Sequence, residues 1–112
     1  MLMLPNDVKI FVSVQPVDLR KSFDGLAALT REVLKQDPVS GHLFVFRNRE
    51  GHRAKVLFWD RTGFVLYYKR LEGARFRFPQ VKGDCLSVDA TQLRMLLDGI
   101  ELGGAWGRTG TL

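Results

Sequence analysis

Disulfide pairs and membrane-spanning runs are absent from this sequence. Cys85 is the single cysteine among 112 residues, so an intramolecular disulfide is impossible, which is typical of a reducing compartment. The apolar start of the chain, Met1–Leu4, is interrupted at once by Pro5 and Asn6, which leaves neither a signal-peptide core nor a membrane span. We therefore expect a cytoplasmic protein that makes no membrane contact.

Motifs of metal binding and catalysis are missing as well. His42 and His52, with one cysteine, do not approach the spacing of a zinc ligand set. No serine lies in a nucleophile elbow, and the pair Gly103-Gly104 follows a helical segment instead of preceding one, as a phosphate-binding loop would. We expect no catalytic residue, no metal ion and no cofactor.

Acidic residues leave a metal-dependent nuclease open as one alternative, because such enzymes hold two metal ions with carboxylates. Each candidate also has a structural interpretation, which we favour. Asp18 would cap the first helix, and Asp24 would lie on its exposed face. Asp60 and Glu72 would occupy hairpin turns.

The charge of the chain is positive and unevenly distributed. The formal net charge is +5, and the isoelectric point is near 9.8. Between His42 and Lys82 there are ten basic and three acidic residues, an excess of seven, whereas the rest of the chain has two more acidic than basic residues. A positive field concentrated in the middle of the chain predicts a polyanionic partner.

Two segments have the periodicity of amphipathic helices. In the first, 18–35, apolar residues recur at steps of three and four, with Asp18 as the expected N-cap and Pro38 beyond its end. The second is expected to begin at Asp89, where Gln92 three residues on would complete a capping box.

Runs of β-branched and aromatic residues predict the strands. A short first strand is expected at Lys9–Val14. Four further runs, separated by short glycine-containing turns, predict an antiparallel meander over Leu43–Arg47, Ala54–Trp59, Phe64–Leu71 and Arg75–Phe78. In the last run, strict alternation predicts both phenylalanines on one face and both arginines on the other.

These elements predict an α+β fold, an antiparallel meander of four to five strands packed against two helices. A chain of 112 residues with 46% hydrophobic and 26% charged residues has the size and composition of one globular domain. We expect a single domain over residues 1–102 and a flexible C-terminal tail at 103–112, which is rich in glycine and threonine.

Aromatic residues interleave with the basic residues of the expected meander. Trp59, Tyr67 and Tyr68 lie on strands that also carry cations, and such a surface can neutralise phosphates and stack on bases. The alternative is an aromatic core whose cations only solvate the rim. The candidate nucleic-acid-binding residues are Arg47, Arg49, Arg53, Lys55, Arg61, Lys69, Arg70, Arg75 and Arg77.

A second candidate site lies at the start of the expected first helix. Arg20 and Lys21 oppose the helix macrodipole there, so an acidic group or a phosphate of a partner would account for them. With Asp24 they form the candidate partner-binding set. The alternative is two solvated side chains that carry no function.

Several ordered motifs carry a resemblance to a known family. They are Val17–Ala27, Leu43–Arg49, Trp59-Asp60 with Gly63-Phe64, Tyr68–Glu72 with Arg75-Phe76, and Gln92–Ile100. These stretches, within residues 5–102, resemble the small TnpB accessory proteins of the insertion-sequence-66 family of bacterial mobile elements. The resemblance implies a role in transposition beside a separate, larger transposase that holds the catalytic acidic residues.

The leading hypothesis is a non-catalytic accessory factor for DNA transposition that binds nucleic acid through the outer face of the hairpin sheet. The expected partners are DNA, the transposase and other proteins of the same element. One alternative is a protein-interaction module that docks the transposase through Arg20, Lys21 and the first helix, without direct nucleic-acid contact. The leading hypothesis requires the cations of the hairpins to share one exposed side.

Overall fold

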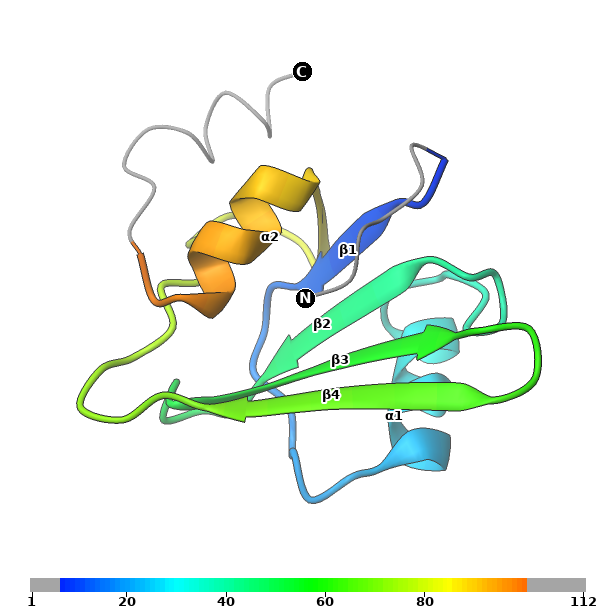
Figure 1. The fold of residues 1–112 in the computed structure, drawn as a ribbon, viewed down its shortest axis with the longest axis horizontal. Helices are drawn as coiled ribbons and strands as arrows, with labels where there is room; N and C mark the ends of the chain where they lie inside the picture. The colour runs from blue at the N-terminus through cyan, green and yellow to red at the C-terminus, as the bar shows by residue number, and fades with distance from the viewer. Residues whose placement is uncertain (1–6, 101–112) are drawn as a thin grey trace.

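The computed structural model describes residues 7–100, which form five strands and two helices (Figure 1). Their bounds are β1 Ile10–Ser13, α1 Phe23–Glu32, β2 Leu43–Arg47, β3 Arg53–Trp59, β4 Phe64–Arg70, β5 Cys85–Val88 and α2 Ala90–Leu97. The expected tail at 103–112 lies outside the described residues, so its flexibility stays a prediction. Neither described helix is long and apolar enough to cross a membrane.

The strands form one mixed sheet in the order β4-β3-β2-β1-β5. Strands β2, β3 and β4 are the antiparallel meander that the sequence predicts, and β5 adds to β1 in antiparallel orientation. The one parallel pair is β1 with β2, joined through α1. The predicted α+β class with two helices is confirmed. The sheet is mostly antiparallel, and its parallel pair was not predicted.

The two helices cover opposite faces of the sheet (Figure 1). Side chains alternate along each strand, so neighbouring residues enter different cores. Val45 and Val56 pack in the cluster that contains Leu96 of α2. Phe44 and Leu57 pack in the cluster that contains Leu26 of α1. Successive apolar residues in the inner strands are therefore explained by burial on both faces.

The expected strand at Arg75–Phe78 is wrong, because these residues form no strand in the structure. The alternation itself holds: Phe76 and Phe78 are buried, and Arg75 and Arg77 are exposed. The segment is held by single contacts, such as the hydrogen bond of 2.7 Å that the Phe76 N–H donates to the Gly51 carbonyl. The fifth strand is instead β5, which the sequence analysis did not predict.

Helix α1 begins later than the sequence predicts. Its N-cap is Ser22, and Asp18 is not the cap. The Asp18 carboxylate accepts a hydrogen bond of 3.0 Å from the backbone N–H of Arg20 and binds the guanidinium of the same residue, so it organises a separate loop. Residues 16–21 thus connect β1 to α1 as an ordered loop, which we call the Asp18 loop.

Helix α2 begins as the sequence predicts. The Asp89 carboxylate accepts from the Gln92 N–H at 2.7 Å, and the Gln92 side chain accepts from the Asp89 N–H at 2.9 Å. This capping box satisfies two backbone donors that a helix otherwise leaves unpaired.

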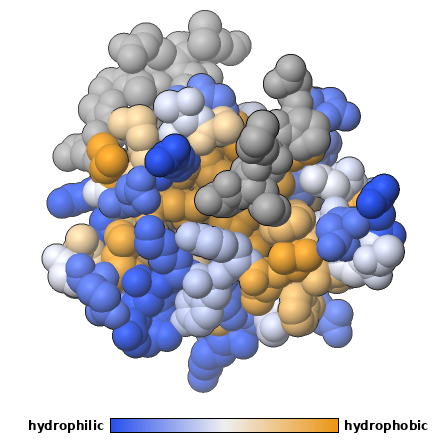
Figure 2. Space-filling view, in the orientation of Figure 1, coloured by the Kyte–Doolittle hydropathy of each residue, from blue (hydrophilic) through white to orange (hydrophobic). Residues whose placement is uncertain are grey.

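One side of the molecule is shown as a surface in Figure 2, in the orientation of Figure 1. An apolar area lies over β3 and β4 toward one end of these strands. Hydrophilic residues gather at the opposite end, around the start of β3 and the end of β4. The face seen in Figure 2 therefore has a polar end. The site described below lies at the same end of β3 and β4, with Arg53 and Tyr68 on the α1 side.

Removal of the capping box tests the start of α2. We expect Asp89→Ala to lower the free energy of unfolding by about 1 kcal/mol, because the N-terminal N–H groups of the helix lose their acceptor. Asp89→Asn is the matched control, since asparagine caps helices about as well. Urea denaturation measures both variants, and equal stability of Asp89→Ala and the unaltered protein would contradict this account of the helix start.

Candidate nucleic-acid interface

A surface hollow of about 490 Å³ lies at the polar end of the sheet. Two connections and two strand ends surround it: the Asp18 loop, the turn between β2 and β3, the start of β3 and the end of β4. We call it the arginine hollow, because three arginines contribute to its lining. The lining residues are Pro16, Val17, Asp18, Leu19, Arg20, Asn48, Arg49, Glu50, Arg53 and Tyr68.

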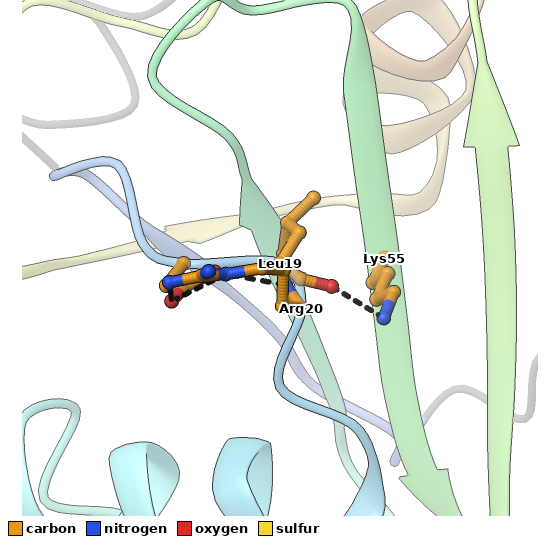
Figure 3. A network of polar contacts seen from close by, with 4 residues as sticks. Leu19, Arg20 and Lys55 are labelled. Carbon is orange, nitrogen blue, oxygen red and sulfur yellow. Dashed lines mark hydrogen bonds and ion pairs between the residues drawn. The ribbon is translucent and has the colours of Figure 1, made fainter.

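The Asp18 loop is tied to the sheet by a buried lysine (Figure 3). Lys55 of β3 donates from Nζ to the Leu19 carbonyl at 2.7 Å, the bond drawn in Figure 3. It also donates to the Lys21 carbonyl at 2.9 Å. The Val17 N–H adds a bond of 2.9 Å to the Arg47 carbonyl. Figure 3 shows the Arg20 side chain extending away from Lys55 on the far side of the loop backbone.

Lys55 is a cation whose acceptors are uncharged. It is only 7% exposed, and no ion pair neutralises it within residues 7–100. Its ammonium also lies 4.9 Å from the centroid of the Tyr68 ring, a cation–π contact. Two carbonyls and one aromatic ring therefore satisfy a buried charge without cancelling it.

Asp18 and Arg20 form an ion pair on the exposed side of the loop. The shortest contact, from Arg20 Nη2 to Asp18 Oδ2, is 2.8 Å, and Arg20 Nε donates to both carboxylate oxygens. Hydrogen bonds from the Arg20 side chain and from its backbone N–H lower the pKa of Asp18 to about 2. The pair fixes the guanidinium at the rim of the hollow and compensates most of its charge.

The turn between β2 and β3 is shaped by Asn48 and Gly51. The Asn48 side chain accepts from the Gly51 N–H at 3.0 Å and from the Arg53 N–H at 3.1 Å. Gly51 takes a φ of +82°, a backbone conformation that glycine adopts without strain. This geometry presents Arg49 and Glu50 to solvent at the hollow. The Arg49 side chain makes no hydrogen bond or ion pair with the described residues.

Arg53 and Tyr68 complete the hollow from adjacent strands. Arg53 Nη1 donates to the Tyr68 hydroxyl at 2.6 Å, and Arg53 Nε donates to His52 Nε2 at 3.3 Å. These bonds, with Lys55 near one side of the ring, hold Tyr68 in one orientation. Tyr68 is nevertheless 49% exposed, which is unusual for a large aromatic residue.

The expectation that the hairpin cations share one exposed side is wrong. Arg47 and Lys69 pair across the sheet with Ala54, which lies in the core on the α2 side. Arg53 and Lys55, the neighbours of Ala54 on β3, therefore face the α1 side. The alternation of a strand divides the predicted binding residues between the two faces.

Besides Arg53 and Lys55, three more of the predicted binding residues, Arg47, Lys69 and Arg70, are engaged by contacts away from the hollow. Arg47 donates to the Val14 carbonyl at 3.1 Å and lies 5.2 Å from the Phe78 ring centroid, and burial lowers the pKa of its guanidinium. Lys69 lies 3.5 Å from an Asp98 carboxylate oxygen of the segment that follows α2. Arg70 pairs with Glu72 at 2.8 Å. These contacts stabilise the fold, so the three cations have structural roles although the sequence predicted them as binding residues.

The remaining predicted residues lie away from the hollow or at its back. Arg61 is in the turn between β3 and β4, a full strand length of about 20 Å from the start of β3. Arg75 donates a hydrogen bond to the Glu50 carbonyl and so supports the turn from behind. Arg77 is exposed on the segment before β5. Of the nine, only Arg49 and Arg53 line the hollow.

The predicted partner-binding set is also divided. Arg20 lines the arginine hollow, whereas Asp24 is exposed in the first turn of α1. The Lys21 side chain packs over Gly25, where an added Cβ would lie 2.9 Å from the Lys21 Cβ. Close packing against the Lys21 side chain thus explains a glycine inside a helix.

Sequence reasoning missed how Asp18, Asn48 and Glu50 contribute to the hollow. The role of Asp18 could have been found from the Asp-x-Arg spacing, which allows the carboxylate to bind both the backbone N–H and the side chain of the arginine. Tyr68 was expected to stack bases together with Trp59 and Tyr67. In the structure, Trp59 instead contacts Phe64 at the other end of β3.

Three of the four acidic residues weighed for a nuclease, Asp18, Asp60 and Glu72, have bonding partners close by in the chain. Asp60 accepts hydrogen bonds from the N–H groups of Thr62 and Gly63, as expected for a turn residue. Within residues 7–100 no three histidine, cysteine or acidic side chains lie together in a metal-binding arrangement.

Comparison with known proteins decides the family. The model of the family described as "IS66 Orf2 like protein" matches residues 8–105, nearly the whole chain. The chain belongs to this IS66 Orf2-like family. Three of the segments that carried the sequence resemblance contribute residues to the arginine hollow: Val17–Ala27, Leu43–Arg49 and Tyr68–Glu72.

Two relatives come from Sinorhizobium fredii (strain NBRC 101917 / NGR234). "Uncharacterized protein y4hO" is 40% identical over 101 residues, 88% of each chain. "Uncharacterized protein y4jC" is 37% identical over 94 residues, 84% of this chain and 80% of the relative. No solved structure matches the chain significantly.

Replacement of the buried lysine tests the attachment of the Asp18 loop. We expect Lys55→Met to lower the free energy of unfolding by about 2 kcal/mol, because the Leu19 and Lys21 carbonyls lose a charged donor. Lys82→Met, at an exposed lysine, is the control and should change it by less than about 0.5 kcal/mol. Equal stabilities in urea denaturation would contradict the role of Lys55.

The acid titration of Asp18 tests the exposed ion pair. The folded pKa of about 2 lies below the ordinary value of 3.8, so the pair stabilises the fold above pH 3.8 and is lost as the pH falls through 2. We expect the Asp18 carboxyl carbon to titrate near pH 2 by NMR. Arg20→Gln should move the midpoint toward 3.8, and Arg31→Gln should leave it in place. A midpoint near 3.8 in the unaltered protein would contradict the ion pair.

Proposed function

We propose that this protein is a non-catalytic accessory factor of transposition that binds DNA through the arginine hollow and assists a separate transposase. Its family supports a place in transposition. The observation that carries the DNA-binding part is the convergence of three arginines, from two loops and a strand, on one concave surface. Arginine is well suited to phosphate, because its planar guanidinium donates two parallel hydrogen bonds.

The charges around the hollow favour a polyanion. Arg49 carries a free guanidinium, and Arg53 adds a second whose bonds go to uncharged partners. The buried Lys55 ammonium contributes to the same positive potential from beneath. Glu50 is the opposing carboxylate, while the Asp18 charge is offset by Arg20. The net charge is therefore positive at the surface that a ligand would contact.

The acidic groups support an accessory role more than a nuclease. A two-metal mechanism needs carboxylates that are free to coordinate metal ions. Asp60 and Glu72 instead bond within their own turn or to a neighbouring arginine. The transposition chemistry would then belong to the larger transposase, and this protein would contribute a DNA contact.

A second candidate is a docking module for the transposase. Phe23 is 44% exposed at the start of α1, between the charged residues Lys21 and Asp24. Aromatic residues are enriched at the centres of protein interfaces, which polar residues surround. This function would need no contact between the protein and DNA.

Loss of two arginines of the hollow tests the DNA contact. We expect Arg49→Ala with Arg53→Ala to weaken DNA binding about tenfold or more and to lower the slope of log affinity against log salt by about two. The matched control is Arg61→Ala with Arg77→Ala, which removes the same charge at exposed positions outside the hollow. Fluorescence anisotropy of labelled DNA at several salt concentrations measures both pairs.

Equal effects of the two double variants would show that net charge alone drives binding and would contradict a site at the hollow. The docking module has a different signature. The isolated protein would cause no anisotropy change, while its co-purification with the transposase would survive nuclease treatment and be reduced by Phe23→Ser.

A further inference from the structure

We infer that the arginine hollow binds an unpaired nucleotide of single-stranded DNA, with the base stacked on Tyr68 and the flanking phosphates held by Arg49 and Arg53. This inference rests on the proposed DNA-binding function and specifies its ligand. It is carried by the shape of the hollow, by the exposure of one fixed aromatic ring and by two arginines of the same lining that form no ion pair with the described residues.

The shape of the hollow suits a single nucleotide. Its volume of about 490 Å³ lies within the range of cavities that hold small organic ligands, roughly 300–1,000 Å³. Readout of duplex DNA generally requires an element that projects into a groove, such as a helix or a β-ribbon. The lining here is concave and consists of loops and strand ends. A base can reach the wall of such a hollow only when it is unpaired.

Tyr68 is already arranged as a stacking platform. Arg53 holds its hydroxyl at 2.6 Å, and the Lys55 ammonium lies 4.9 Å from its ring centroid. One side of the ring therefore faces the buried lysine, while the residue as a whole is 49% exposed and lines the hollow. A ring that is fixed before binding loses little conformational freedom when a base stacks on it.

Two arginines share the lining of the hollow with the Tyr68 ring and could hold the phosphates that flank a stacked base. Arg53 comes from β3 beside Tyr68, with register partners that place both side chains on the α1 side of the sheet. Arg49 projects from the neighbouring turn and has no partner in the described part of the chain. Proteins that bind single strands combine such a positive path with an aromatic platform.

The described helices offer a poorer site for duplex DNA. A recognition helix presents the residues of its N-terminal half to the major groove. The first turn of α1 carries Asp24, and the basic residues of the two helices, Arg31 and Arg94, lie in their last turns. The charge distribution of the helices therefore opposes that mode, whereas the hollow presents its cations to solvent.

Anisotropy titrations of the full chain with three labelled probes test the inference: oligothymidylate, oligouridylate and a blunt DNA duplex of the same length. We expect oligothymidylate to bind more tightly than the duplex. Tyr68→Leu should weaken oligothymidylate binding by about tenfold or more, because a stacked base is lost. It should leave the weaker duplex binding unchanged.

Two further variants separate stacking from other effects. Tyr68→Phe keeps the ring and should bind oligothymidylate within about twofold of the unaltered protein. Phe23→Leu removes an exposed aromatic residue outside the hollow and should have no effect on any probe. Circular dichroism spectra and urea midpoints of each variant verify that the fold is intact.

The outcomes distinguish the inference from the function on which it rests. If duplex and single strand bind equally and both depend on Arg49 and Arg53, the DNA-binding function stands and the unpaired-nucleotide site is overturned. A preference for oligouridylate would overturn the assignment to DNA. If no probe binds, while capture of the transposase depends on Tyr68, both the inference and the DNA-binding function are overturned in favour of a protein ligand.

Discussion

The burial of the Lys55 ammonium is the constraint on which the rest of the site depends. A buried ammonium group must find acceptors or lose its charge. Lys55 finds them in the Leu19 and Lys21 carbonyls, 2.7 and 2.9 Å away. The Asp18 loop is therefore drawn across the end of the sheet, and the hollow exists between this loop and the turn that carries Arg49. Carbonyl partners leave the positive charge in place, so the contact that builds the site also contributes to its potential.

The formal charge of the central segment overestimates the number of cations that can contact a ligand, because several of them bind other groups of the protein. Arg47 packs against Phe78, Lys69 reaches Asp98, and Arg70 pairs with Glu72. The cations at the hollow that lack a carboxylate partner are the guanidinium groups of Arg49 and Arg53. They lie next to the Asp18–Arg20 ion pair, whose charges offset each other. Long-range attraction of a polyanion depends on the sum of charges, whereas contact depends on those few that are free. A screen guided by net charge alone would therefore include many arginines and lysines that mainly stabilise the protein.

Local patterns predicted much of the fold and less of the site. The capping box at Asp89 and the meander of β2 to β4 were predictable, since both depend on residues close in sequence. The Arg75–Phe78 segment shows the limit, because alternation predicts which side chains are buried but not whether a neighbouring strand is present to pair. Strand β5 and the parallel pairing of β1 with β2 depend on contacts between distant segments. The hollow has the same origin, because it joins the Asp18 loop to residues about thirty positions or more along the chain, and no periodicity reports such a meeting.

The position of β4 explains why its cations and its tyrosine have different roles. Within residues 7–100 no strand pairs with the outer edge of β4, and charged side chains on an edge strand discourage pairing with other molecules. Lys69 and Arg70 discourage such pairing whether or not a ligand binds. Tyr68 does not, because a half-exposed aromatic residue on an edge strand favours association. The hydrogen bond of its hydroxyl and its cation–π contact keep the ring in this exposed position, which is unfavourable for the free protein. A bound base that covers the ring would remove this cost, which makes Tyr68 the residue of the hollow whose placement most needs a ligand to explain it.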